Sequence, residues 1–214
     1  MNQSTAQGGL IDRYNIDKYK LYNFLKDVQE SYNADVPYHN AKHASDILQA
    51  AYYALNKVNS GSGRALKDLL TTDEALSLIL AVIGHDIGHI GKTNHFLTLT
   101  RHEFAILDPE SPNEAMHFRV FRDKLAKWQI LSHLPDQQRH QIMGNIETLI
   151  LATNMDHHER ILKEWRALTN FSLGSAQCRM ALMKYVLKFC DVSNPARGQV
   201  RVHSRIVSFK FNSA

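Results

Sequence analysis

A chain of 214 residues is long enough for one domain with a hydrophobic core or for two small ones. Apolar residues make up 44% of the chain, which excludes a disordered protein, and the net charge of +4 comes from interspersed basic and acidic residues. Because the chain has no run of basic residues and no stretch of about 18 apolar ones, we expect neither nucleic-acid binding nor a membrane-spanning segment.

The N-terminus and the cysteines bear on the cellular compartment in which the protein is expected. The segment MNQSTAQGGL has no charged start followed by an apolar run, so it does not look like a signal peptide. Cys178 and Cys190 lie within an apolar helical pattern without C-x-x-C spacing, which favours buried free thiols over a disulfide. Both features predict a cytoplasmic protein.

The first part of the chain shows three helical patterns after a flexible N-terminus, which we expect over residues 1–14. Apolar residues three and four apart predict a helix over 15–33, and an Ala- and Leu-rich helix is expected over 39–58. The third helix begins after Thr71, which has Glu74 at capping-box spacing, and runs apolar to Gly84. A helix that is apolar all round belongs at the centre of a helical domain.

The second part continues the same pattern. Further helices are predicted near residues 93–107, 113–128, 136–153, 156–168 and 175–190. Alternation of apolar and polar residues is short and occurs only in RIVSFKFN, near the end. The predicted fold class is therefore all-α, a compact bundle of about eight helices.

The apolar third helix leads into HDIGH, which contains His85, Asp86 and His89. On a helix, the two histidines lie at positions i and i+4 of one face. Imidazole and carboxylate groups bind Zn²⁺ and other divalent metals, and a carboxylate can bridge two ions. A single histidine in an apolar segment is more often a hydrogen-bonded core residue. A buried aspartate beside it is costly unless it is paired or bound to a metal.

Two other stretches carry the same residue types. YHNAKHASD places His39 and His43 at i and i+4, which a surface helix can also carry by chance. In KFCDVSNPAR, Asp191 ends an apolar helical run, where an aspartate is also a common turn residue. Together with HDIGH, these stretches supply a set of two histidines and two aspartates, with one histidine left over for proton transfer.

The remaining histidines are not assigned to a site. We expect four of them at the surface, namely His102, His133, His140 and His203. Spacing does not place the other four, namely His95, His117, His157 and His158.

The order of motifs resembles the catalytic domain of the class I cyclic nucleotide phosphodiesterases, which are HD-type metal phosphohydrolases. The motifs are H-N-x-x-H, H-D-x-x-H-x-G-x-x-N-x-F, A-T-x-M and D-x-S-N-P. The resemblance covers about residues 15–197, and its specificity comes from several motifs in the right order. It implies hydrolysis of 3′,5′-cyclic nucleotides, cAMP or cGMP, to 5′-nucleoside monophosphates.

The resemblance also implies a ligand set. Zn²⁺ would occupy the tighter of two sites, with four protein ligands: His43, His85, Asp86 and Asp191. Asp86 would also contact the second ion, Mg²⁺ or Mn²⁺, and a hydroxide between the two ions would attack phosphorus. This agrees with the chemistry, because two metals neutralise phosphoryl charge and supply hydroxide near pH 7, while a histidine can protonate the leaving alkoxide.

Other matching positions receive roles in the same way. His39 would be the general acid that protonates the leaving O3′, and Glu114 would order water and support that acid. His89 and Thr153 would lie beside the metals, with Thr153 hydrogen-bonded to a water. Tyr38 and Asn194 would form walls of the base pocket.

The chain departs from the family in three places. Ile90 replaces the usual proline, and Asn154 replaces an aspartate, which removes a negative charge near the metals. After Pro195 the family continues into a helical subdomain that covers the nucleotide pocket, whereas this chain ends in GQVRVHSRIVSFKFNSA. We therefore expect a partial phosphodiesterase domain over 15–197, without that C-terminal subdomain, and a tail outside the family over 198–214.

Two alternatives stay open beside the enzyme. One is an inactive or regulatory fragment whose uncovered apolar faces bind a partner. The other is an HD-type phosphohydrolase for nucleoside mono- or triphosphates, which shares the H…HD…D skeleton. Regulatory domains or a dimer partner would belong to a longer parent protein.

Overall fold

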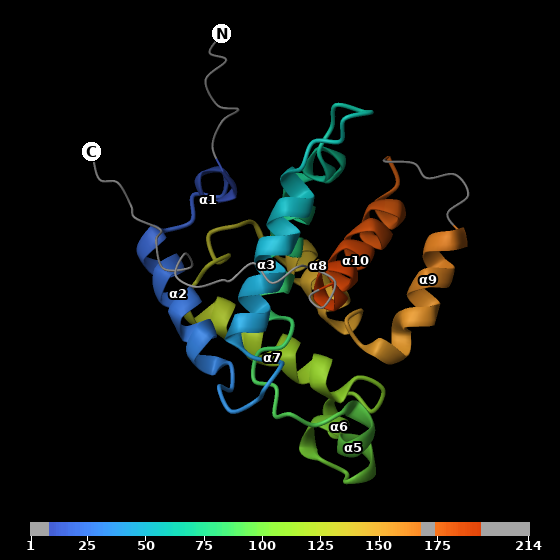
Figure 1. The fold of residues 1–214 in the computed structure, drawn as a ribbon. Coiled ribbons are helices and arrows are strands. Elements are labelled where there is room, and N and C mark those ends of the chain that lie inside the picture. Colours follow the sequence, from blue (N-terminus) through green and yellow to red (C-terminus); the bar gives the residue numbers. More distant parts are fainter. Residues whose placement is uncertain (1–8, 168–173, 194–214) are drawn as a thin grey trace.

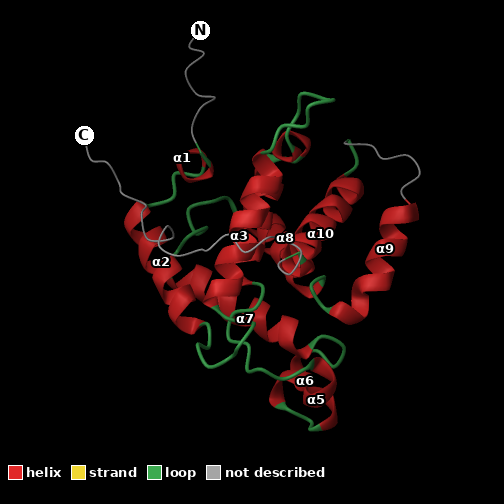
Figure 2. Cartoon of the chain, in the orientation of Figure 1, coloured by secondary structure: helices red, strands yellow, loops and turns green. Residues whose placement is uncertain are grey.

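The computed structural model describes residues 9–167 and 174–193, which form an all-α fold, as predicted (Figure 1). This part of the chain contains ten α-helices, two short 3₁₀-helices and no strand (Figure 2). The α-helices are α1 (Leu10–Arg13), α2 (Lys18–Ser31), α3 (Ala41–Asn56), α4 (Thr72–Gly84), α5 (Asn94–Leu99), α6 (Glu103–Leu107), α7 (Pro112–Lys127), α8 (Asp136–Leu151), α9 (His158–Ala167) and α10 (Ala176–Val192). The 3₁₀-helices are η1 (Leu66–Leu69) and η2 (Met155–His157).

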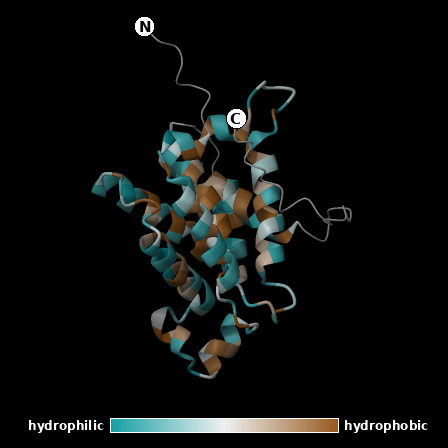
Figure 3. Cartoon of the chain, turned by 90° about the vertical axis from the view of Figure 1, so that its left-hand side faces the viewer, coloured by the Kyte–Doolittle hydropathy of each residue, from teal (hydrophilic) through white to brown (hydrophobic). Residues whose placement is uncertain are grey.

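Helix α4 lies at the centre, as its apolar sequence predicts. It packs against α3, α7, α8 and α10, and Leu78, Ala81 and Val82 have no exposed surface. Hydrophobic segments gather in the middle of the bundle, and hydrophilic ones lie mostly outside (Figure 3). The predicted capping box is present, since Thr71 and Glu74 exchange two backbone-to-side-chain hydrogen bonds of 2.8 and 3.2 Å. Burial of this apolar helix is what fixes the loop that follows it.

Two predicted helices begin later than expected. The helix predicted over 15–33 begins at Lys18, because the Asp17 side chain accepts a hydrogen bond from the Lys20 amide and caps it. The helix predicted over 39–58 begins at Ala41, because Asn40 caps it through the amides of Lys42 and His43. His39 and His43 are therefore not one turn apart on a helix.

Two further predictions of helix were wrong. The segment 93–107 forms two helices, α5 and α6, because the chain turns at Arg101, which has a φ of 53°. HDIGH is a turn and not a helix, since α4 ends at Gly84 and Gly88 has a φ of 75°. A β-carbon at Gly84 would lie 2.3 Å from the Phe121 ring, so this end of α4 requires glycine.

The structure also bears on the predictions for the cysteines and for membrane-spanning segments. Cys178 and Cys190 are buried and unbridged, as predicted. Among the described helices, none combines the length and the hydropathy that a bilayer span requires. Asn194, His203 and the expected tail over 198–214 lie outside the described residues.

Candidate metal centre

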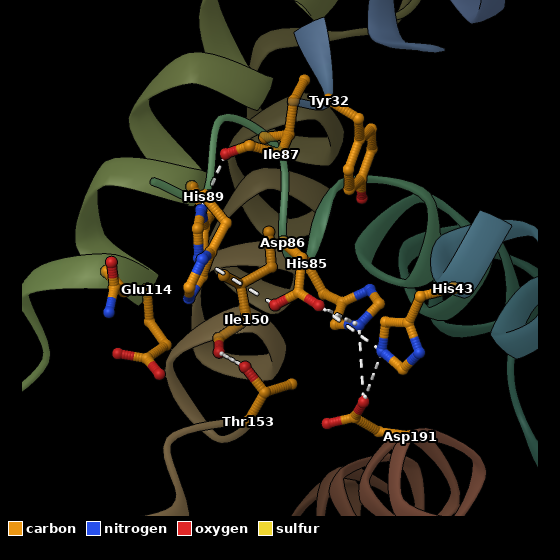
Figure 4. A network of polar contacts seen from close by, with 12 residues as sticks. Tyr32, His43, His85, Asp86, Ile87, His89, Glu114, Ile150, Thr153 and Asp191 are labelled. Carbon is orange, nitrogen blue, oxygen red and sulfur yellow. Dashed lines mark hydrogen bonds and ion pairs between the residues drawn. The ribbon is translucent and has the colours of Figure 1, made fainter. Parts of the chain in front are cut away.

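Four side chains predicted as ligands converge from three elements. His43 comes from the first turn of α3, His85 and Asp86 follow α4, and Asp191 comes from the last turn of α10. One ligand atom from each lies within 4.8 Å of the others. His43 Nε2 is 3.0 Å from Asp191 Oδ1, and His85 Nε2 is 3.2 Å from Asp86 Oδ2 (Figure 4). The structure thus brings the predicted set together.

Local structure aims these side chains. The His85 Nδ1 atom donates to the carbonyl oxygen of Val82 at 2.9 Å, which leaves Nε2 facing the cluster. Metal-binding histidines are usually oriented through the other ring nitrogen in this way. His43 is placed by the Asn40 cap, and Asp191 by the end of α10.

The donor set fits a divalent cation. His85 Nε2 and Asp86 Oδ2 are buried, and neither finds a hydrogen-bond partner among the described residues. Unpaired buried polar atoms are costly, and a cation held between two imidazoles and two carboxylates would satisfy them. Burial opposes ionisation of Asp86 and Asp191, but the neighbouring imidazoles outweigh it and hold both pKa values well below the usual range. Both carboxylates are therefore ionised at neutral pH, as ligands must be.

A row of stacked imidazoles lies beside the cluster. The His89 ring stacks on His39 with centroids 4.2 Å apart and on His117 at 5.5 Å. Burial lowers the pKa of His89 and of His117 to about 4, so both rings are neutral at pH 7. His117 donates from Nδ1 to the Ile87 carbonyl at 2.7 Å, and its Nε2 lies 3.9 Å from Asp86 Oδ1.

Histidine spacing alone did not assign His117. Its signal is its position on α7, three residues after Glu114, which places both side chains on one helix face. His102 caps α6, His95 is exposed, and neither belongs to the cluster. His133 and His140 are exposed, as predicted.

Glu114 and Thr153 occupy the ends of two neighbouring helices. Glu114 lies in the first turn of α7 and accepts a 2.8 Å hydrogen bond from Asn94 Nδ2. Burial raises the pKa of this carboxyl. Thr153 follows α8 and donates from its hydroxyl to the Ile150 carbonyl at 2.7 Å. In the view of Figure 4, Glu114 lies on the other side of Asp86 from His43.

The two residues expected in a base pocket have different outcomes. Tyr38 is exposed, and its ring centroid lies 4.5 Å from that of His43 and 5.0 Å from that of His39. An aromatic ring is therefore available beside the metal centre. Asn194 lies outside the described residues.

Comparison with known proteins identifies the same family. Residues 38–211 match the family described as 3'5'-cyclic nucleotide phosphodiesterase. The chain is 32% identical to the dual specificity calcium/calmodulin-dependent 3',5'-cyclic nucleotide phosphodiesterase 1 of Drosophila melanogaster, over 92% of this chain and 23% of that protein. It is 30% identical to the cGMP-specific 3',5'-cGMP phosphodiesterase 3 of Dictyostelium discoideum, over 89% of this chain and 41% of that protein.

A solved structure is also similar. The phosphodiesterase domain of the RhoPDE fusion protein from the choanoflagellate Salpingoeca rosetta superposes with a TM-score of 0.79 and 27% identity, over 88% of this chain and 59% of that one. The chain thus spans less than half of the two curated relatives. The family match begins at 38 and ends at 211, so the domain boundaries expected at 15 and 197 stay predictions.

Proposed function

The chain belongs to the 3′,5′-cyclic nucleotide phosphodiesterase family, and we propose that it hydrolyses a 3′,5′-cyclic nucleotide to the 5′-nucleoside monophosphate. The observation that carries this proposal is the set of two histidines and two aspartates, in which His85 Nε2 and Asp86 Oδ2 are buried without a hydrogen-bond partner among the described residues. One curated relative is named for cyclic AMP and another for cGMP, so both cAMP and cGMP are candidate substrates.

We propose Zn²⁺ for the site formed by His43, His85, Asp86 and Asp191, because mixed imidazole and carboxylate sets suit zinc. A second ion, Mg²⁺ or Mn²⁺, would share Asp86, since hard cations take carboxylate oxygens and keep several waters. When bound, such ions neutralise charge on phosphoryl oxygens and lower the pKa of water.

The protein's own groups handle the protons. His39 is outside the four-residue ligand set, and its ring is held by stacking on His89. We assign it as the acid that protonates the leaving O3′. Glu114, oriented by Asn94, would accept a hydrogen bond from water and support His39. The Thr153 hydroxyl donates to the Ile150 carbonyl, so the hydroxyl oxygen stays available to accept a hydrogen bond from a water.

The substrate would enter beside Tyr38. Its exposed ring next to His39 provides an apolar face on which a purine can stack, with the phosphate toward the ligand set. We propose Asn194 as a second wall.

The test is a turnover assay on the 214-residue chain with Zn²⁺ plus Mg²⁺ or Mn²⁺. Incubated with cAMP and cGMP in turn, the chain is expected to produce the corresponding 5′-monophosphate, resolved by chromatography, and to lose this activity with a chelator. No product from either nucleotide at full metal occupancy would contradict the proposal and favour the inactive fragment. Hydrolysis of nucleoside mono- or triphosphates instead would favour the other HD-type enzymes.

A further inference from the structure

A buried lysine of α10 binds the chain just after α8. Lys188 is 5% exposed, and its Nζ donates to the carbonyl oxygens of Ala152, Thr153 and Asn154 at 3.3, 3.2 and 2.9 Å. An ammonium group has three donors, so each is used. Carbonyls at a helix C-terminus lack intrahelical partners and carry partial negative charge, which favours a cation there.

A buried asparagine continues the connection to α7. Asn154 is 2% exposed, and its Nδ2 donates to the Glu110 carbonyl at 3.0 Å and to Ser111 Oγ at 2.9 Å. Its Oδ1 accepts from the Asp156 amide at 2.9 Å. Glu110 and Ser111 directly precede α7, whose first turn carries Glu114.

We infer that these two side chains act as one positioning unit, the Lys188–Asn154 clamp. Lys188 lies three residues before Asp191 and holds the backbone of Thr153, while Asn154 holds the start of the helix that carries Glu114. The clamp therefore joins the elements that carry Asp191, Thr153 and Glu114, and it sets the spacing between a proposed zinc ligand and the two side chains proposed to order water near the second cation. It touches no proposed ligand directly. The inference rests on the proposed function for the presence of that second cation.

The identity of residue 154 follows from this geometry. An aspartate at this position, as the family resemblance leads one to expect, has no N–H to donate. It would place a carboxylate oxygen opposite the Glu110 carbonyl, and an acceptor that faces an acceptor is destabilising. In this chain the amide joins α7 to the residues after α8, so Asn154 does more than remove a charge.

The experiment measures Mn²⁺ binding to the zinc-loaded full chain by electron paramagnetic resonance, beside zinc content and thermal melting. Lys188→Met is expected to weaken Mn²⁺ binding about 10–100-fold, the usual effect of losing an outer partner of a metal site. Asn154→Asp should weaken it in the same direction but less. Both variants should retain the zinc content of the wild type, and Lys188→Arg should recover part of the loss.

Matched controls lie in the same fold. Lys184→Met removes a lysine one turn earlier on α10, whose Nζ lies 3.5 Å from Glu164, and Asn23→Asp changes a half-buried amide of α2. Neither should alter Mn²⁺ binding. The clamp is overturned if both test variants bind Mn²⁺ like the wild type, if they lose zinc and manganese together, or if the wild type binds no second ion. Failure of cyclic nucleotide hydrolysis with these binding effects intact would count against the proposed function only.

Discussion

Helices α4 and α10 run side by side, and their two ends hold different polar clusters. Glu74 precedes Asp86 by twelve residues, and Arg179 precedes Asp191 by twelve. At the first end, the Glu74 carboxylate accepts from Arg179 Nε at 2.8 Å and from the Thr71 amide at 2.8 Å. At the other end, His85 Nε2 and Asp86 Oδ2 have no hydrogen-bond partner among the described residues.

The difference separates a structural cluster from the proposed metal site. Protein groups alone complete the Glu74 cluster, so it stabilises the position of α10 against α4. The Asp86 cluster gathers two carboxylates that repel each other and leaves two buried polar atoms without a hydrogen-bond partner among the described residues, which the proposed cation would satisfy. Functional sites commonly carry such a local cost, which the rest of the fold offsets.

Loss of a proposed ligand should weaken metal binding by the Asp86 cluster. In Asp191→Asn, we expect zinc binding to weaken by more than the roughly 10–100-fold that an outer partner contributes, with loss of turnover. With a chelator present, the variant should melt below the wild type, because the imidazoles that lower the pKa of Asp191 make its ionised form stabilise the metal-free fold. Calorimetric zinc titration and melting curves check both points. Zinc affinity equal to that of the wild type would remove Asp191 from the ligand set.

A change beside the cluster should separate chemistry from binding. His39→Asn is expected to lower kcat by about 10²–10⁴-fold, the range for loss of a general acid. Zinc content should stay unchanged, since His39 is not among the four grouped ligand atoms. Single-turnover kinetics and metal analysis measure the two effects. The assignment of His39 as the acid fails if kcat is retained. The control His95→Asn changes an exposed histidine of α5 and should keep wild-type kcat.

Disrupting the Glu74 cluster should have the opposite effect, with lower stability and unchanged zinc binding. Arg179→Met leaves the buried Glu74 carboxylate without its cation, and we expect the free energy of unfolding to fall by about 3 kcal/mol. Zinc stoichiometry should remain that of the wild type. Denaturant unfolding of this variant is compared with that of Arg160→Met, which changes an exposed arginine of α9. Zinc loss without destabilisation would reverse the roles given to the two ends.

Asp27 is another carboxylate whose hydrogen bonds all come from protein groups, and its removal is expected to have a smaller effect on stability. Burial raises its pKa, but hydrogen bonds from Lys124, Lys127 and Trp128 outweigh burial and hold the pKa well below the usual range. Ionised Asp27 therefore stabilises the fold above about pH 4, and this contribution is lost as the pH falls through the lowered folded-state pKa.

The measurement is the free energy of unfolding between pH 7 and pH 2. Asp27→Asn should be about 1–2 kcal/mol less stable than the wild type at pH 7, and the difference should shrink toward pH 2. Asp123→Asn, at an exposed pair with Arg122, should show little difference at either pH. A constant difference for Asp27→Asn would mean that its charge is not what stabilises the fold.

Sequence patterns predicted the features that depend on local periodicity. The all-α fold, the buried α4 and the Thr71–Glu74 capping box follow from spacing and residue type. Helix ends were predicted less well, because they depend on single residues. Gly88 turns HDIGH out of the helix, and Asn40 delays α3 until after His39.

Contacts between segments far apart in the sequence could not be predicted from local sequence patterns. The motif order predicted the His43, His85, Asp86 and Asp191 set, yet spacing left His117 unassigned, because burial against Ile87 is a tertiary property. The role of Lys188 could not be predicted either, since its carbonyl partners belong to a segment more than 30 residues away. A lysine within an apolar helical run is visible in the sequence, but its partner is not.

The central claim is that a cation completes the Asp86 end of the α4–α10 pair. A crystal of the zinc-loaded chain, measured at the zinc absorption edge, tests this directly. The account predicts an anomalous difference peak within coordination distance of His43 Nε2, His85 Nε2 and the carboxylates of Asp86 and Asp191. A zinc-saturated crystal with no peak there, or with its peak elsewhere in the chain, would contradict it.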